Sequence, residues 1–217
     1  MTLLAPPGVY APQADTALLA EALYEEPLSP GARVLDVGTG TGALAIAAAM
    51  RGAEVTAIDI SRRAVLTARV NARLARLPVR VLRGDLLTPV VGGAYDLILS
   101  NPPYVPARTA TAPRRGAARA WDAGYDGRLL VRRICGEAPP LLRPGGALLM
   151  VHSALSDPDT SLRELRAEGL KAAVIARRFI PFGPVLRERR SWLDAQGLIE
   201  DDETTEELVV IRAERPE

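Results

Sequence analysis

The sequence predicts a single α/β domain with a mostly parallel sheet, and two observations lead to this fold class. Residues 33–50 read as an apolar strand, a glycine-rich turn and a small-residue helix in that order, which is one half-unit of a Rossmann-type sheet. Acidic side chains then follow successive apolar runs, as expected where parallel strands end at one edge. A chain of 217 residues is long enough for one well-buried domain of this kind and too short for two ordinary ones.

Composition places the chain among globular proteins, with 48% hydrophobic residues, 24% charged residues and a formal net charge of +1. No apolar run approaches the roughly 20 residues that span a bilayer, and the first ten residues lack a signal-peptide pattern, so we expect a cytoplasmic protein. Cys135 is the only cysteine and His152 the only histidine. The sequence therefore predicts no intramolecular disulfide and no His/Cys metal site.

The basic residues are almost all arginine, with Lys171 as the single lysine. Together with the high alanine and proline content, this indicates a GC-rich genome more than a selected basic surface. We interpret the arginine clusters as solvated faces, while binding of phosphate or an acidic partner stays open. The clusters are Arg114, Arg115 and Arg119, and Arg187, Arg189 and Arg190.

The first elements follow from local signals. Prolines exclude a helix from the first twelve residues, and a helix is expected over 17–23 with Asp15 or Thr16 as its N-cap. The apolar run 33–37 then enters a turn in which Gly38 and Gly40 allow the backbone to approach a ligand closely. The helix over 44–50 offers unpaired N–H groups to a carboxylate or phosphate. The glycines alone fit either NAD or S-adenosylmethionine.

Two acids favour a nucleoside that carries an amino acid. Asp36 precedes the glycine turn, where its charge would repel a pyrophosphate but can orient an ammonium group directly or through water. Asp59 ends the second apolar run, where a carboxylate can accept both ribose hydroxyls, and Ser61 caps the next helix. A third run, over 79–82, leads to Asp85.

The fourth strand, over 95–99, opens into Ser100-Asn101-Pro102-Pro103-Tyr104. The two prolines fix the turn and leave their carbonyls as acceptors, while Asn101 is held extended because it precedes a proline. Asn101 Oδ1 and the Pro102 carbonyl can together accept both hydrogens of a planar NH2 group, on which the Tyr104 ring can stack. The alternative is a rigid strand-end turn with a buried tyrosine.

The remaining elements complete the sheet. An irregular stretch follows, and a helix from Leu129 to Leu141 is bent by Pro139 and Pro140. Residues 143–146 are expected to turn into a strand over 147–152 that His152 ends; this histidine is a possible base but more often a structural residue. A helix over 161–168, a strand over 170–176, an excursion with a basic helix and a final strand over 208–211 follow. The strands at both ends of the excursion indicate an antiparallel last pair.

Asn101-Pro102-Pro103-Tyr104 resembles the signature of the amino-group methyltransferases, which use S-adenosyl-L-methionine and include protein glutamine N5- and adenine N6-methyltransferases. Residues 9–16 are similar to the segment that opens the short, single-domain branch of the glutamine enzymes, although Ala11 and Ala14 replace two glutamates of that pattern. The resemblance implies a Rossmann-like class I methyltransferase fold with seven strands and an antiparallel last strand.

The resemblance also implies roles for particular residues. It places Thr16 against the cofactor and makes Asp85, with the Leu86 backbone, the acceptor of the adenine amine. Trp121 becomes a candidate wall of the substrate site, with core packing as the alternative. The whole chain, 1–217, is then one domain with a cofactor-covering segment (1–30), a substrate lid (105–127) and an excursion before the last strand (179–206).

The implied reaction is transfer of the sulfonium methyl group to a planar nitrogen, with S-adenosyl-L-homocysteine as the product. The short-branch resemblance favours glutamine N5 of a protein such as a translation release factor, with a small zinc-binding partner covering the third-strand edge. An adenine N6 acceptor in nucleic acid and a small metabolite remain alternatives. A different class of protein, an NAD-dependent Rossmann oxidoreductase, also remains open.

Overall fold

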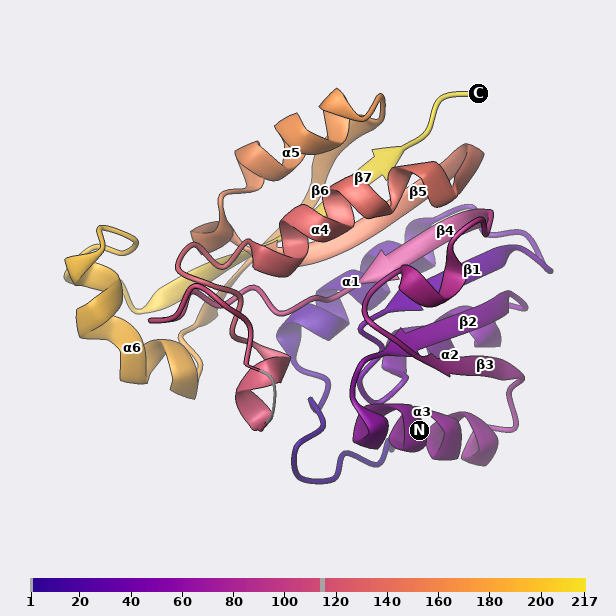
Figure 1. Cartoon of the computed structure of the whole chain (residues 1–217), viewed down its shortest axis with the longest axis horizontal. Coiled ribbons are helices and arrows are strands. Elements are labelled where there is room, and N and C mark those ends of the chain that lie inside the picture. Colours follow the sequence, from indigo (N-terminus) through magenta and orange to yellow (C-terminus); the bar gives the residue numbers. More distant parts are fainter. Residues whose placement is uncertain (1, 114–115) are drawn as a thin grey trace.

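The computed structural model describes residues 2–113 and 116–217, and its strands form one sheet in the order β3-β2-β1-β4-β5-β7-β6 (Figure 1). Neighbouring strands from β3 to β5 are parallel, and β7 is antiparallel to both β5 and β6. The predicted fold class is therefore confirmed. The strands are β1 (Arg33–Val37), β2 (Glu54–Asp59), β3 (Val79–Arg83), β4 (Tyr95–Ser100), β5 (Leu142–Ser153), β6 (Lys171–Pro181) and β7 (Thr205–Glu214).

Helices cover both faces of this sheet, with α4 and α5 in front and α1 and α2 behind in Figure 1. The central strands β1, β4 and β5 are almost continuously apolar and buried, as expected for parallel strands that are covered on both sides. No described helix is long and apolar enough to cross a membrane. The helices are α1 (Ala14–Glu25), α2 (Ala43–Met50), α3 (Arg62–Leu74), α4 (Leu129–Glu137), α5 (Pro158–Ala167) and α6 (Pro184–Ala195).

The start of α1 differs from the prediction. Its N-cap is Gln13, whose side chain makes no capping bond, and neither Asp15 nor Thr16 caps the helix. Both residues lie inside the first turn and are buried, and their side chains bond to Tyr104 and Asn101 of the loop after β4. The cap predicted for α3 is confirmed, since Ser61 Oγ accepts from the Ala64 N–H at 3.4 Å.

Several later boundaries also differ. The helix α4 ends at Glu137, and Pro139–Leu141 form a separate 3₁₀ turn instead of a bent continuation. Strand β5 begins at Leu142, and its Gly145 and Gly146 pair with Arg215, so the expected turn over 143–146 is part of the sheet. Strand β6 runs to Pro181 and β7 starts at Thr205, which shortens the excursion to residues 182–204.

His152 belongs to the core. It is fully buried at the end of β5, with Nδ1 2.9 Å from the Ser153 carbonyl oxygen and Nε2 3.1 Å from Ser161 Oγ. Burial lowers the pKa of His152 to about 4, so the ring is neutral near pH 7. This environment supports the structural role over the role as a base.

Candidate active site

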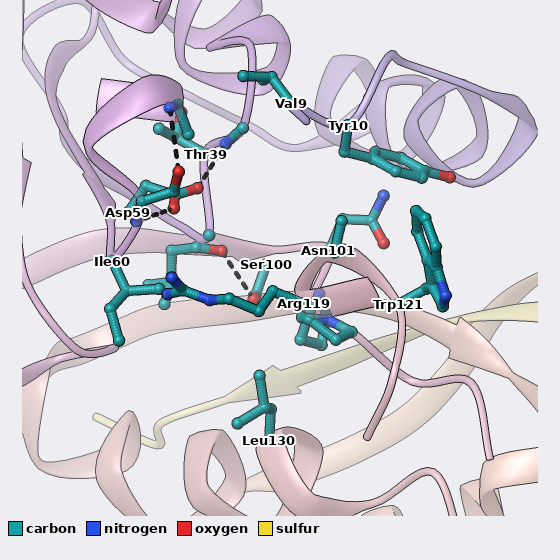
Figure 2. Close-up of a pocket in the computed structure, with 18 of the residues that line it drawn as sticks. Val9, Tyr10, Thr39, Asp59, Ile60, Ser100, Asn101, Arg119, Trp121 and Leu130 are labelled. Atoms are coloured by element: carbon teal, nitrogen blue, oxygen red, sulfur yellow. Dashed lines mark hydrogen bonds between the residues drawn. The ribbon is translucent and has the colours of Figure 1, made fainter. Parts of the chain in front are cut away.

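One cavity of about 900 Å³ lies at the carboxyl ends of β1, β2 and β4. Its walls come from the segment before α1, the glycine turn, the loop after β4, the irregular stretch that follows it, and the start of α4. Figure 2 shows Thr39 and Asp59 at one end and Tyr10, Asn101 and Trp121 at the other. Every candidate site residue except Asp36 lines this cavity: Thr16, Gly38, Gly40, Asp59, Asp85, Leu86, Asn101, Pro102, Pro103, Tyr104 and Trp121.

Asp36 lies beneath the glycine turn and does not line the cavity. Its Oδ2 accepts from Thr39 Oγ1 at 2.6 Å and from the Ala45 N–H at 3.1 Å, while Oδ1 has no hydrogen-bond partner in the described chain. Burial raises the pKa of Asp36 to about 6. The Asp36 carboxylate thus fixes the glycine turn and the first residues of α2. Its link to the cavity is the hydrogen bond from Thr39, which lines the cavity.

The glycine turn has the conformation that its composition indicates. Gly38 and Gly40 have φ angles of 76° and 54°, which L side chains rarely adopt. A side chain at Gly40 would also meet the Tyr10 carbonyl oxygen at 3.7 Å, so the segment before α1 passes directly over this turn. The turn therefore leaves open backbone where a ligand can approach.

Asp59 is tied to the same turn. Its Oδ2 accepts from the Gly40 N–H at 3.0 Å and its Oδ1 from the Ser61 N–H at 2.8 Å. Burial raises the pKa of Asp59 above its usual value, against these two hydrogen bonds and the positive charge of Arg119. Each carboxylate oxygen keeps a lone pair for a further donor.

Asp85 lies at the rim with a half-exposed side chain, and both of its oxygens accept from Nη1 of Arg133 on α4, at 3.1 and 3.0 Å. Leu86 follows with a left-handed φ of 44° and also lines the cavity. This end of the site therefore combines an apolar side chain with a carboxylate that is paired with an arginine.

The loop after β4 brings Asn101 and Tyr104 against α1. Asn101 Nδ2 donates to Thr16 Oγ1 at 3.3 Å, and the Tyr104 hydroxyl donates to Asp15 Oδ2 at 3.1 Å. Tyr104 is only 8% exposed, and its burial beside Asp15 raises its pKa well above the usual value. The Tyr104 ring lines the cavity, but most of it packs in the hydrophobic core. Its environment is therefore mostly that of a buried tyrosine in a strand-end turn, which was the alternative to a stacking role.

The stretch expected as a lid is fixed at its base. Val105 donates to the Trp121 carbonyl oxygen at 2.7 Å and accepts from the Ala123 N–H at 3.0 Å. Arg189 of α6 bonds to the Pro106 carbonyl oxygen at 2.8 Å and to Asp122 at 2.6 Å. The excursion thus supports this stretch. The expected cluster members Arg114 and Arg115 lie outside the described residues.

Sequence reasoning missed several residues of the site. Tyr10 and Asp15 stand in the segment 9–16 that carried the family resemblance, but only Thr16 was assigned a role there. Arg119 was grouped with surface arginines, yet it lines the cavity and its charge acts on Asp59. Glu206, buried at the start of β7, does not line the cavity, but its charge acts on Tyr10 and Tyr104. It gave no signal in the sequence because it stands in a run of acidic and polar residues.

The strand order, with its antiparallel last strand, and the position of the cavity define the class I methyltransferase fold. Solved structures with this fold include the E. cuniculi Mtq2–Trm112 complex, responsible for methylation of the eRF1 translation termination factor. It has a TM-score of 0.69 at 24% identity over 96% of this chain and 99% of that chain. The T. thermophilus 16S rRNA N2 G1207 methyltransferase, in complex with AdoMet and guanosine, has a TM-score of 0.60 at 22% identity over 94% and 44%.

Residues 1–115 match the model of the methyltransferase small domain, and the chain belongs to this family. It is 34% identical to a putative protein N5-glutamine methyltransferase of Methanocaldococcus jannaschii, over 81% of this chain and 88% of that protein. It is 47% identical to the release factor glutamine methyltransferase of Deinococcus radiodurans, over 65% of this chain but only 52% of that protein. The resemblance inferred from the sequence is confirmed. The enzyme is a methyltransferase and not the oxidoreductase that the glycine turn alone left open.

Proposed function

We propose that this protein is an S-adenosyl-L-methionine-dependent methyltransferase that modifies the side-chain N5 of glutamine in a protein such as a translation release factor. The single observation that carries the proposal is the Asn101-Pro102-Pro103-Tyr104 loop lining the same cavity as the glycine turn and Asp59. A donor and an acceptor can therefore meet inside one site. The names of the relatives from M. jannaschii and D. radiodurans support glutamine as the acceptor.

The described residues fit the proposed cofactor. Gly38 and Gly40 leave room that side chains would fill, and Asp59 has lone pairs for two ribose hydroxyls. Leu86 offers an apolar contact for a base, and Asp85 can accept an exocyclic amine while it stays paired with Arg133. When bound, S-adenosyl-L-methionine would supply an electrophilic methyl group on sulfur and leave as S-adenosyl-L-homocysteine.

The loop residues address the weakness of the acceptor. An amide nitrogen is a poor nucleophile because its lone pair is delocalised into the carbonyl group. Asn101 Oδ1 and the Pro102 carbonyl oxygen can each accept a hydrogen bond from one N–H group of the acceptor amide. These two bonds fix the orientation of the amide nitrogen toward the methyl group and increase its electron density. Orientation of this kind can supply several kcal/mol of the barrier. Tyr104 and Trp121 line the same cavity, where their rings can contact the plane of the amide.

The test is transfer of labelled methyl from S-adenosyl-L-methionine to a panel of release factors, adenine-containing oligonucleotides and small-molecule extract, with the product mapped by mass spectrometry. We expect label on a glutamine N5. Label on adenine or on a metabolite would replace the proposed acceptor. Asn101→Ala should keep affinity for S-adenosyl-L-homocysteine in calorimetry while turnover is lost, and normal turnover would exclude the loop from the chemistry.

We further propose that a small zinc-binding subunit covers the edge of the sheet at β3. This strand pairs only with β2 in the described sheet, and Arg69 donates to its Val81 carbonyl oxygen at 2.8 Å. The neighbouring helix α3 exposes Leu66, Val70 and Leu74 at a spacing of four residues. The E. cuniculi neighbour is itself a complex, which is consistent with a partner here.

Co-expression with small zinc-binding proteins of the same genome, followed by light scattering after gel filtration, tests this interface. We expect a one-to-one complex that the double variant Leu66→Asp, Leu74→Asp no longer forms. The circular dichroism of the variant should match that of the wild type, because both side chains are exposed. A complex that survives both substitutions would place the partner elsewhere.

A further inference from the structure

We infer that Asp15 is a positioning residue: through Thr16, it fixes which end of the Asn101 side-chain amide faces the cavity. The inference rests on the proposed function, because it concerns the group that receives the acceptor nitrogen. The three residues are far apart in the chain, but helix α1 brings the first two against the loop after β4.

The Asp15 carboxylate is 3% exposed and receives four donors. Oδ1 accepts from the Thr16 N–H at 2.5 Å and from Thr16 Oγ1 at 3.2 Å. Oδ2 accepts from the hydroxyls of Tyr10 at 2.7 Å and Tyr104 at 3.1 Å. The hydroxyl groups of Tyr10, Thr16 and Tyr104 all donate to Asp15, so all three point their protons at its carboxylate oxygens.

This arrangement leaves Thr16 with one possible role toward Asn101. A threonine hydroxyl has a single proton. In Thr16 this proton is donated to Asp15, so the Thr16 hydroxyl oxygen can only accept a hydrogen bond from any other neighbour. The neighbouring atom is Asn101 Nδ2 at 3.3 Å. The NH2 end of the amide is therefore turned to Thr16, and the carbonyl end, Oδ1, is left for the cavity.

The orientation matters because the two ends of an asparagine amide are nearly equal in size but opposite in hydrogen bonding. If the Asn101 amide were flipped, its NH2 group would face the NH2 group of the acceptor. Two groups of donors would then meet, and neither would find a hydrogen-bond acceptor. The same carboxylate holds Tyr104, the last residue of the loop, and Tyr10, whose backbone passes over the glycine turn. Asp15 thus joins the segment before α1 to both ends of the Asn101–Tyr104 loop.

The kinetic test compares Thr16→Val in two backgrounds. Valine keeps the shape of threonine but has no hydroxyl, so in the wild-type background we expect about a tenfold loss of kcat at saturating substrates. In the Asn101→Asp background the two carboxylate oxygens are equivalent and neither end has to be selected, so the same substitution should cost clearly less kcat than in the wild-type background. Asp15→Asn should also lower kcat in the wild-type background, but part of its loss should persist in the Asn101→Asp background because Asp15 also holds Tyr10 and Tyr104. Equal losses in both backgrounds would overturn the inference.

A second readout does not depend on activity. In the 15N-HSQC spectrum of the ligand-free protein, the Asn101 side-chain NH2 pair is identified by its absence from Asn101→Asp. We expect Thr16→Val to shift this pair and Thr16→Ser, which keeps the hydroxyl, to restore both its position and most of the lost kcat. A pair that Thr16→Val leaves in place would overturn the inference.

Thermal melts show whether each variant folds, and Thr16→Ala replaces Thr16→Val in both measurements if the valine variant does not. If the wild type methylates no glutamine, the proposed function fails, but the NMR signal still decides the orientation of the amide.

Discussion

Replacing Gly127 with alanine should displace the carbonyl of Tyr104. Gly127 has a φ of 69°, and a Cβ there would lie 2.3 Å from the Tyr104 carbonyl oxygen and 2.5 Å from Ser156 Oγ. These two atoms form a buried hydrogen bond of 2.6 Å, which the new methyl group must break. The left-handed backbone costs a non-glycine residue about 1–2 kcal/mol, and the lost buried bond about 1–3 kcal/mol more. The expected loss in the free energy of unfolding is therefore about 2–5 kcal/mol.

Gly124→Ala is the matched control for this substitution. Gly124 lies in the same segment with a φ of 83°, but a Cβ there would meet its nearest atoms only at 3.6 Å. It should lose only the conformational part, about 1–2 kcal/mol. Urea unfolding of both variants measures the difference, and kcat should fall further in Gly127→Ala because Tyr104 belongs to the Asn101–Tyr104 loop, which we propose binds the acceptor. Equal destabilisation of the two variants would refute the steric argument.

Three further predictions concern pH, the lid and the cofactor. Burial raises the pKa of Glu206 from about 4.5 to about 7, so its contribution to stability is full below pH 4.5 and is lost as pH rises to 7. Glu206→Gln should remove this loss, so that between pH 4.5 and 8 its free energy of unfolding rises by about 3 kcal/mol relative to that of the wild type. Urea titrations at several pH values measure this difference, and a difference that stays constant with pH would contradict the prediction. Arg189→Ala should speed proteolysis between residues 107 and 121 and raise the KM for the acceptor, since Arg189 donates hydrogen bonds to Pro106 and Asp122. Arg187→Ala on the same helix is the control. Equal cleavage rates in the two variants would show that Arg189 does not anchor this stretch. S-adenosyl-L-homocysteine, and not NAD, should raise the melting temperature, and stabilisation by NAD alone would refute the cofactor assignment.

Much of the fold could be predicted because its signals are local. The apolar runs, the glycine turn and the Ser61 cap depend on residues within a few positions of one another. The boundaries of β5 and β6 could not be predicted in this way, because they depend on residues far away in the chain. Leu142 at the start of β5 pairs with Tyr95 of β4, and β6 is extended by its pairing with β7. Gly145 and Gly146 indicate a turn, yet Arg215 pairs with them.

The site shows the same division. Asp59 and the Asn101–Tyr104 loop follow strands directly, so the topology alone places them at one edge of the sheet. Asp15 was interpreted as a helix cap because capping is the common use of an acid at that position. One of its actual partners, Tyr104, is 89 residues away, and no local pattern indicates such a contact.

The anchored base of the stretch after Tyr104 has a consequence for how such enzymes diversify. Main-chain hydrogen bonds join Val105 to Trp121 and Ala123, and Arg189 donates to the Pro106 carbonyl oxygen, so both ends of the stretch are anchored. Insertions or deletions between residues 108 and 120 therefore need not strain the sheet and helices that support it. Recognition of new targets can therefore evolve in that segment, except at Arg119, whose charge acts on Asp59.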